Sequence, residues 1–271
     1  MPGMTVEEAI AVVADTGYDG IEIAARSDYD GAPATMPNKR RREVRRRLDE
    51  TGLRLTALME HQQPSTSDSE HTKQLDQLRQ VARLASDLAT GETPPVQTTL
   101  GGGTWMEKRS LFRDRLGDWI EVLRDEGVVL AIKPHRGGAL SRPAEAVWLI
   151  RELNETPWLR MVYDYSHYAF REMTVEDTVA TSLPYTAHIA VKDALQQGER
   201  VVFRLPGESQ TFDYPNLLRR FYRGGYRGDV CCEVSSMVSK AADYDPVHAA
   251  RICYQNMALS MEQAKIPRPK R

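Results

Sequence analysis

The stretch Gly127–Leu140, GVVLAIKPHRGGAL, joins a short apolar run to a polar segment. The run follows a glycine that ends a helix and stops at a proline, which is typical of a buried parallel strand. Because side chains alternate along a strand, Lys133 and His135 share one face. In parallel α/β proteins, ligands bind at the carboxyl ends of the strands. This strand is therefore predicted to deliver a lysine and a histidine to a site.

The composition is that of an ordinary soluble protein. The length, 271 residues, is close to the usual size of a (β/α)8 barrel. A net charge of −2 gives no field that would attract nucleic acid or acidic membranes. Three cysteines without a CxxC motif argue against a disulfide framework or a thiolate zinc site. Without a signal peptide or a membrane-length apolar run, a cytoplasmic location is expected.

The apolar pattern predicts strands alternating with helices along the whole chain. The strands are expected at residues 19–25, 53–61, 95–100, 128–133, 159–164, 186–193 and 228–235. The helices are expected between Thr5 and Gly17 and at residues 39–50, 70–89, 105–126, 143–154, 175–182, 216–223 and 246–262. Residues 196–214 are expected to form an irregular excursion, and the basic tail 265–271 to fray. This alternation requires a mainly parallel sheet, and no linker divides it, so one domain over residues 1–271 is predicted.

The predicted helix at residues 39–50 carries the run KRRREVRRR. Such a run could indicate nucleic-acid binding, but no aromatic residues lie among the charges to stack on bases. Val44 and Leu48, four residues apart, could face a core, as an outer helix requires. We interpret the segment as a solvated helix of a barrel and expect no nucleic-acid partner.

Several motifs occur in a characteristic order. They are TVEEAIAVVADTGYDGIEI at 5–23, AHIAVKDA at 187–194, LPGESQTFDY at 205–214 and GYRGDVCCE at 225–233. Together with the polar strand ends, they resemble the xylose isomerase-like TIM-barrel superfamily, which contains the sugar phosphate isomerases and epimerases. The resemblance covers nearly the whole chain and implies a (β/α)8 TIM-type barrel.

The first departure from this family lies at the N-terminus. The family has a strand before its first helix, whereas only Met1–Met4 precede that helix here. The barrel is therefore expected to lack or truncate its first strand, unless the natural start lies further upstream. An open barrel exposes unpaired strand edges, which proteins usually cover. Pairing with another chain would also cover them, so a homo-oligomer is one expectation.

The second departure concerns the metal. The resemblance implies one divalent ion, Mn²⁺ or Mg²⁺, held by Glu, Asp, His and Glu from four strands. Asp164 and Glu233 match the second and fourth ligands, but Lys133 and Ala190 fall on the first and third. Two carboxylates make a weak site for a hard cation, and an adjacent ammonium repels one. The metal mechanism of the family is therefore not expected to carry over intact.

Glu233 and Lys133 are the predicted catalytic pair. In the metal-dependent relatives, two glutamates move a proton next to a carbonyl that the metal polarises. Here Glu233 remains as one acid–base group, and its partner is Lys133. Nearby carboxylates keep a lysine charged, so we expect an ammonium in the place of the metal. The alternative is that Lys133 only neutralises two inherited carboxylates in an inactive site.

Further side chains are predicted to bind substrate. His135 and His167 follow strand ends, and either could rebuild a metal site with Asp164 and Glu233. Glu22 is expected to face the barrel interior, toward substrate or a core arginine. The other predicted positions are Lys192, as a strand-end pair with Asp193, Arg204 (or Arg200), His61, and His188 as a deeper core histidine.

We interpret the chain as a sugar phosphate isomerase/epimerase-like protein that transfers a proton next to a carbonyl. A keto-sugar, a polyol or a related small carbohydrate is the expected partner, and no membrane is expected. A non-catalytic carbohydrate-binding or assembly protein is the alternative. A repair endonuclease of the endonuclease IV kind shares the fold, but it needs a three-metal cluster for which the six histidines are not placed.

Overall fold

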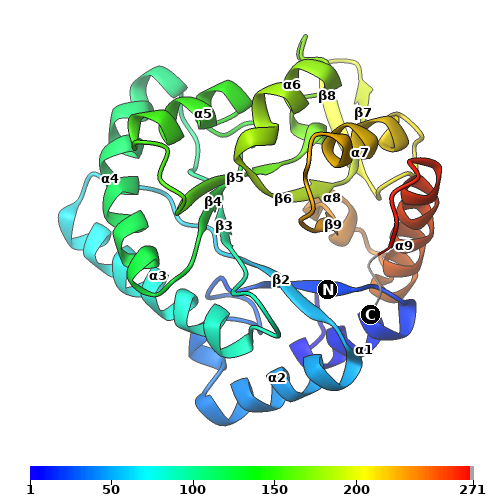
Figure 1. The fold of residues 1–271 in the computed structure, drawn as a ribbon, viewed down its shortest axis with the longest axis horizontal. Coiled ribbons are helices and arrows are strands. Elements are labelled where there is room, and N and C mark those ends of the chain that lie inside the picture. Colours follow the sequence, from blue (N-terminus) through cyan, green and yellow to red (C-terminus); the bar gives the residue numbers. More distant parts are fainter. Residues whose placement is uncertain (269–271) are drawn as a thin grey trace.

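The computed structural model describes residues 1–268 and contains a sheet of seven strands. The strands pair in the order β1-β2-β3-β4-β5-β6-β9, and every pair is parallel. They are β1 (Gly20–Ala24), β2 (Arg54–Met59), β3 (Val96–Thr98), β4 (Leu130–Ile132), β5 (Leu159–Tyr163), β6 (Thr186–Val191) and β9 (Val230–Cys232). The sheet curls into the inner wall of a barrel (Figure 1). The seven predicted strands are confirmed.

Helices surround this wall, as the alternating pattern predicts (Figure 1). They are α1 (Val6–Thr16), α2 (Asn38–Thr51), α3 (Asp68–Leu88), α4 (Trp105–Asp125), α5 (Pro143–Glu152), α6 (Val175–Ser182), α7 (Tyr214–Arg223) and α9 (Pro246–Gln263). The first of them begins at a capping box in which Thr5 accepts from the Glu8 N–H and Glu8 accepts from the Thr5 N–H. It ends at Gly17, whose φ of 102° lies in the left-handed region that glycine adopts without strain.

The barrel is open between β1 and β9. These strands are the two edges of the sheet, and within residues 1–268 nothing pairs with their free sides. A cavity of about 750 Å³ separates them and is lined by both strands and by α1 and α9. The helices close over the gap from outside, where the rings of Tyr18 and Tyr254 pack edge to face at 5.1 Å. The expected barrel without a complete first strand is thus confirmed.

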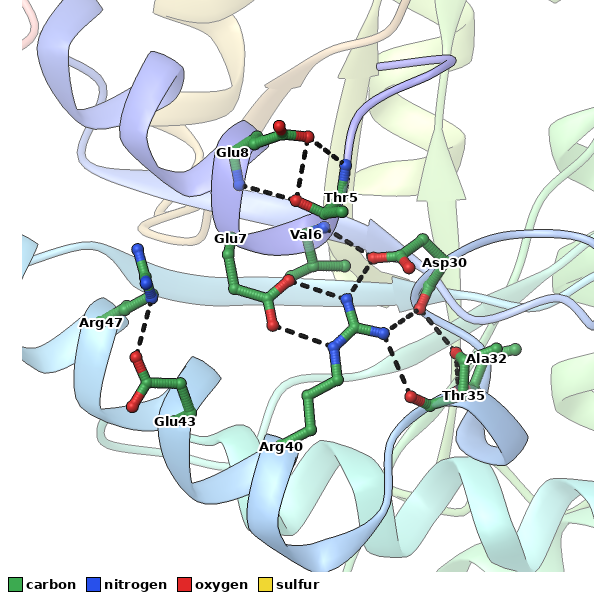
Figure 2. Close-up of polar contacts among 10 residues, drawn as sticks. All are labelled: Thr5, Val6, Glu7, Glu8, Asp30, Ala32, Thr35, Arg40, Glu43 and Arg47. Atoms are coloured by element: carbon green, nitrogen blue, oxygen red, sulfur yellow. Dashed lines mark hydrogen bonds and ion pairs between the residues drawn. The ribbon is translucent and has the colours of Figure 1, made fainter.

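Arg40, near the start of α2, ties the N-terminal region together (Figure 2). Its Nε and Nη2 donate to the Glu7 carboxylate at 2.9 and 2.7 Å, and its guanidinium also pairs with Asp30. Asp30 in turn accepts the N–H of Val6 at 2.7 Å. One half-buried guanidinium therefore holds α1, the loop after β1 and α2 in fixed positions.

Replacing Arg40 with alanine is expected to lower the free energy of unfolding by about 1–2 kcal/mol, because two partly buried carboxylates lose their charged donor. Urea unfolding of the wild type and the variant would measure the loss. Arg45 is a matched control on the same helix, since it makes an exposed pair with Asp49 at 3.0 Å. Its replacement should change the stability by less than about 0.5 kcal/mol. Equal losses for both variants would contradict the proposed tie.

The remaining arginines of α2 lie on its outer side. Val44 and Leu48 are fully buried, as expected of the inward stripe of an outer helix. Four of these side chains pair with nearby carboxylates, for example Arg41 with Asp87 at 2.8 Å and Arg46 with Glu43 at 2.7 Å. The helix thus has the arrangement expected of a solvated outer barrel helix.

The segment after β6 contains structure that the sequence pattern did not reveal. It forms an antiparallel hairpin of β7 (Asp193–Gln197) and β8 (Arg200–Arg204) where an irregular excursion was expected. A four-residue helix, α8 (Ser236–Ser239), follows β9. Of the tail that was expected to fray, Arg268 is bound to Asp19 at 2.9 Å, and residues 269–271 lie outside the described part of the chain. No helix within residues 1–268 is long and apolar enough to cross a membrane.

Candidate functional site

Four charged residues stand at the carboxyl ends of four strands. Lys133 follows β4, Asp164 follows β5, Lys192 follows β6 and Glu233 follows β9. The backbone N–H of Lys133 donates to the carbonyl of the neighbouring strand β3 at 2.8 Å, and that of Glu233 donates to β6 at 2.9 Å. The sheet ladder thus continues just past the strand ends and fixes where the side chains start. Since parallel strands end at one rim, all four reach the same region.

The four side chains form a closed ring of alternating charge. The Oδ2 atom of Asp164 lies 3.0 Å from the Nζ of Lys133 and 2.6 Å from the Nζ of Lys192. The Oε1 atom of Glu233 lies 2.6 Å from the Nζ of Lys192, and its Oε2 pairs with Lys133. Each carboxylate therefore contacts both ammonium groups, and the ring has no net charge.

Lys192 is the centre of this arrangement. Besides the two carboxylates, its Nζ lies 3.1 Å from the Nε2 of His167. An ammonium has three N–H donors, and here three acceptors surround it. Asp164, His167 and Glu233 also form a group of side chains whose ligand atoms lie within 4.8 Å of one another. The amine of Lys192 binds all three members of this group.

Burial and charge act in opposite directions on the ring. Asp164 is completely buried, Lys192 and Lys133 are 2 and 5 % exposed, and the Glu233 side chain keeps 27 % of its surface. Burial alone would raise the pKa of Glu233, but the two ammonium groups outweigh it and lower this pKa to about 2. The pKa of Asp164 is likewise held well below its usual range despite burial. The pKa of Lys133 is raised above its usual value, because its two carboxylate partners outweigh its burial. Lys133 is therefore an ammonium ion, and Asp164 and Glu233 are carboxylates, at neutral pH.

Two histidines adjoin the ring as neutral imidazoles. Burial, and then the ammonium of Lys133, lowers the pKa of His135 to about 4. The pKa of His167 is lowered well below its usual range by burial and by Lys192. The two rings pack with their centroids 4.0 Å apart. His167 is fully buried, whereas His135 is partly exposed. Of the two, His135 is the one that a bound molecule could reach.

The unpredicted hairpin completes the site. Phe203 on β8 places its ring 5.2 Å from the Nζ of Lys192 and 5.3 Å from the ring of His167. A cation above an aromatic face is attracted to it, so Phe203 covers and stabilises the ammonium. The apolar, β-branched run in RVVFR beside Gly198 was a signal for this strand, but the charged residues around it favoured a loop.

The structure separates the predicted pair of Lys192 and Asp193. Lys192 faces the ring, while the Asp193 carboxylate accepts the backbone N–H groups of Gly207 and Ser209 at 3.1 and 2.8 Å. Neighbouring residues at a strand end point to opposite sides, so one enters the barrel and the other anchors the loop after β8. The two neighbours thus position different parts of the structure, and Lys192 makes more contacts in the site than the sequence indicated.

The other predicted residues lie apart from the ring. Arg204 has one hydrogen bond among the described residues, from its guanidinium to the carbonyl of Phe203 at 3.3 Å. The exposed His61 contacts Thr99 at 3.2 Å and makes no hydrogen bond with the ring among the contacts described. Glu22 faces the interior, as predicted, but its Oε2 lies 3.1 Å from the Nε2 of His188 and no core arginine meets it among the contacts described.

The residues do not fit the divalent ion that the family resemblance implies. Ala190, at one ligand position, packs against Ala131 and Val162 inside the barrel. Lys133, at another, carries a positive charge into the site. The three groups that could form a rebuilt site, Asp164, His167 and Glu233, already bind the ammonium of Lys192. A second cation in the same place would meet two ammonium groups at close range.

The low carboxylate pKa values predict how stability depends on pH. A group whose pKa is lower in the folded chain stabilises it above the pKa of the unfolded chain, and this contribution is lost as the pH falls through the folded value. For Glu233, the stabilising contribution is lost as the pH falls from about 4.5 to about 2. Across this pH range, the free energy of unfolding should fall by up to about 1.4 kcal/mol per pH unit for each such group.

Urea unfolding at pH 5 and pH 3 would measure this fall. The variant Glu233→Gln should show a smaller fall than the wild type, because one titrating group is gone while all other carboxylates remain. The same fall in both proteins would show that Glu233 has an ordinary pKa.

Glu233 also borders the cavity between β1 and β9. A volume of about 750 Å³ is within the range of small-molecule sites, roughly 300–1,000 Å³. Of the four ring members, only Glu233 lines this cavity.

The fold is shared with several solved structures. A 3-keto-D-glucoside 4-epimerase, YcjR from E. coli, is 17 % identical with a TM-score of 0.72, covering 95 % of this chain and 94 % of that one. A D-psicose 3-epimerase solved in the presence of D-fructose is 13 % identical with a TM-score of 0.77, covering 97 and 94 %. A xylose isomerase-like TIM barrel protein from Mycobacterium smegmatis in complex with magnesium is 17 % identical with a TM-score of 0.70, covering 95 and 87 %. No curated protein matches the sequence.

The family assignment comes from the sequence match. The model of the family described as xylose isomerase-like TIM barrel matches residues 10–254, which span β1 to β9 and the first half of α9. This range contains all four members of the charged ring. The chain therefore belongs to the xylose isomerase-like TIM barrel family.

Proposed function

We propose that this protein is a sugar isomerase or epimerase that transfers a proton next to a carbonyl without a divalent metal. The observation that carries the proposal is the ring itself: an ammonium pair holds both carboxylates where the family resemblance places a metal. Two structures of similar fold are sugar epimerases, which supports a small carbohydrate as the substrate class. A ring without net charge suits a neutral keto-sugar.

Lys133 is the proposed electrophile. A substrate carbonyl oxygen that accepts from its Nζ would be polarised by a full positive charge in a largely water-free place. When the C–H bond next to the carbonyl breaks, its electron pair moves toward that oxygen. The ammonium stabilises the enediolate that forms.

Glu233 is the proposed base. Its low pKa makes it a weak base while both ammonium groups are bound to it. When a substrate oxygen accepts a hydrogen bond from the Nζ of Lys133, Lys133 leaves Glu233. The loss of this ammonium partner would raise the pKa of Glu233. Substrate binding would thus produce the base at the moment when it is needed. Return of the proton to the same or the neighbouring carbon completes an epimerisation or an isomerisation.

The other groups position this pair. Lys192 stays bound to Asp164 and His167 and holds Glu233 through its Oε1. His135, neutral and partly exposed, can donate to or accept from a sugar hydroxyl. Glu22 lines the same cavity as Glu233 and is a second candidate contact. Arg204 is not placed to take part by any contact described, and its predicted role remains untested.

A non-catalytic carbohydrate-binding protein is the second candidate. It is favoured by one observation, namely that both oxygens of Glu233 are occupied by ammonium groups. If the substrate does not displace Lys133, no base is available and the site only binds.

Exchange of carbon-bound hydrogen with deuterium oxide separates the two candidates. The purified chain would be incubated in deuterium oxide with a panel of keto-sugars, D-fructose and D-psicose among them, and followed by proton NMR. Exchange next to the carbonyl supports proton transfer. Binding seen by calorimetry without exchange supports the second candidate. If no sugar of the panel gives exchange or binding, both candidates are contradicted.

A further inference from the structure

A second cluster lies inside the barrel, one layer below the charged ring. Glu22 on β1, His188 on β6 and Cys231 on β9 offer ligand atoms that lie within 4.8 Å of one another. Cys231 and Glu233 are two residues apart on the same strand, so they share the inward face in successive layers. None of these three residues contacts Lys133, Asp164 or Lys192 in the charged ring through a hydrogen bond or ion pair described within residues 1–268.

His188 is the residue that points to a missing partner. It is only 1 % exposed, yet its Nε2 makes no hydrogen bond with any described residue. The nearest acceptor, the Oε2 of Glu22, lies at 3.1 Å without hydrogen-bond geometry. Leaving a buried polar atom unpaired costs about 1–3 kcal/mol, so such an atom needs an explanation.

The donor set identifies the class of ligand. One imidazole, one carboxylate and one thiol are typical ligands of zinc and similar divalent ions, whereas Mg²⁺ and Ca²⁺ prefer oxygen atoms only. Zinc bond lengths place ligand atoms of a tetrahedral site roughly 3.3–3.8 Å apart, so separations of up to 4.8 Å would shorten by at most about 1.0–1.5 Å when an ion binds. The Nε2 of Gln97 donates to Glu22 and holds that carboxylate in place.

The position of the cluster suggests what an ion would do there. Glu22 and Cys231 belong to β1 and β9, the two unpaired edges of the sheet. Both residues also line the cavity between these strands, which gives an ion and a water ligand a way in. An ion bound to both would join edges that no hydrogen bond connects among the described residues.

We propose that Glu22, His188 and Cys231 bind a zinc-like divalent cation that clamps β1 to β6 and β9 and holds the open barrel together. The site is structural and separate from the charged ring, so it stands whether or not the ring is catalytic. A water molecule from the cavity completes the coordination.

Cobalt binding tests the proposal, because Co²⁺ replaces Zn²⁺ and a thiolate ligand gives it a charge-transfer absorption band. The full chain, treated with a chelator, would be titrated with Co²⁺ and then with Zn²⁺. The expected result is about one Co²⁺ per chain with this band, followed by its loss when Zn²⁺ displaces the cobalt. A titration without the band would overturn the proposal.

Two cysteine variants form a matched pair. Cys231→Ser should abolish the band. Cys232→Ser should leave it unchanged, because Cys232 lies on the opposite face, with its thiol 3.8 Å from the carbonyl of Cys253. His188→Gln should weaken binding at least tenfold. A band that survives in Cys231→Ser, or one that disappears in Cys232→Ser, would contradict the assignment.

A third variant separates this cluster from the charged ring. Glu233→Gln removes a carboxylate of the ring and leaves the lower cluster intact, so the band should persist. Its loss would show that Glu233 takes part in binding the ion and would contradict the separation of the two sites. The outcome of the sugar-exchange experiment does not affect this result, so the two proposals fail independently.

The wild-type chain offers a measurement that needs no variant. Zn²⁺ should raise its thermal midpoint, by roughly 5–10 °C at a free concentration of about 100 times the dissociation constant. It should also protect Cys231, but not Cys232, from alkylation as mapped by mass spectrometry. An unchanged midpoint together with unprotected Cys231 would overturn the proposal even if a variant failed to fold.

Discussion

Replacing Lys133 with methionine is expected to reduce the rate of proton exchange next to the carbonyl of a keto-sugar by about 10²–10³-fold. Methionine keeps much of the length of the side chain and removes its charge. Without the ammonium, the enediolate loses the group proposed to stabilise it, while Glu233 keeps only Lys192 as a partner. The rate would be measured by NMR in deuterium oxide, after circular dichroism has shown that the variant is folded.

The controls for this experiment separate charge from general disturbance. Lys39→Met removes an exposed lysine on α2, far along the chain from the ring, and should leave the rate unchanged. Lys133→Arg keeps the charge but replaces a compact ammonium with a planar fork, so it should restore only part of the rate. A Lys133→Met variant that exchanges at the wild-type rate would show that Lys133 is not the electrophile.

The fold could largely be predicted from the sequence because it depends on local patterns. The capping box at Thr5, the glycine after α1 and the apolar stripe of each helix act within one or two turns. Strand ends followed from the change from apolar to polar residues, as at Ile132 and Lys133. The β7–β8 hairpin was missed because polar residues make up half of its two strands and surround its turn, and only pairing with each other makes these segments strands.

The candidate site was harder to predict, because its contacts join residues far apart in sequence. The rim residues Lys133, Asp164 and Glu233 were identified, since each follows a strand. Which carboxylate a long lysine reaches depends on the curvature of the sheet, so the role of Lys192 could not be foreseen. The sequence also gave no indication that His188 would meet Glu22 and Cys231, which lie on three different strands.

The two lysines differ in what their removal should reveal. Lys133 borders Glu233, the most exposed member of the ring, whereas Lys192 is 2 % exposed and is surrounded by three acceptors. Lys133 can therefore exchange a carboxylate for a substrate oxygen at modest cost. Both lysines contact the completely buried Asp164, but Lys192 lies closer to it, at 2.6 Å against 3.0 Å, and also contacts the buried His167. Function is expected to depend on the first lysine and stability on the second.

Replacing Lys192 with methionine is accordingly expected to lower the free energy of unfolding by about 3–5 kcal/mol, since breaking a buried ion pair leaves an uncompensated charge. Urea unfolding would measure the loss. The double variant Lys192→Met/Asp164→Asn removes one charge of each sign and leaves Lys133 paired with Glu233. Its loss of unfolding free energy should be smaller than the sum of the losses in the two single variants, because neither remaining charge lacks a partner.

The loss in Lys192→Met should also depend on pH in a defined direction. The native variant holds two carboxylates and one ammonium in a buried place, so it gains stability by taking up a proton that the unfolded chain does not bind at the same pH. Stability then falls as the pH rises, and the penalty relative to the wild type should be smaller at pH 5.5 than at pH 8. The proton would reside on a carboxylate of the ring or on His167, whose low pKa depends in part on Lys192. A penalty that is the same at both pH values would mean that water, and not a proton, compensates the charge, and that the ring is less closed than its burial indicates.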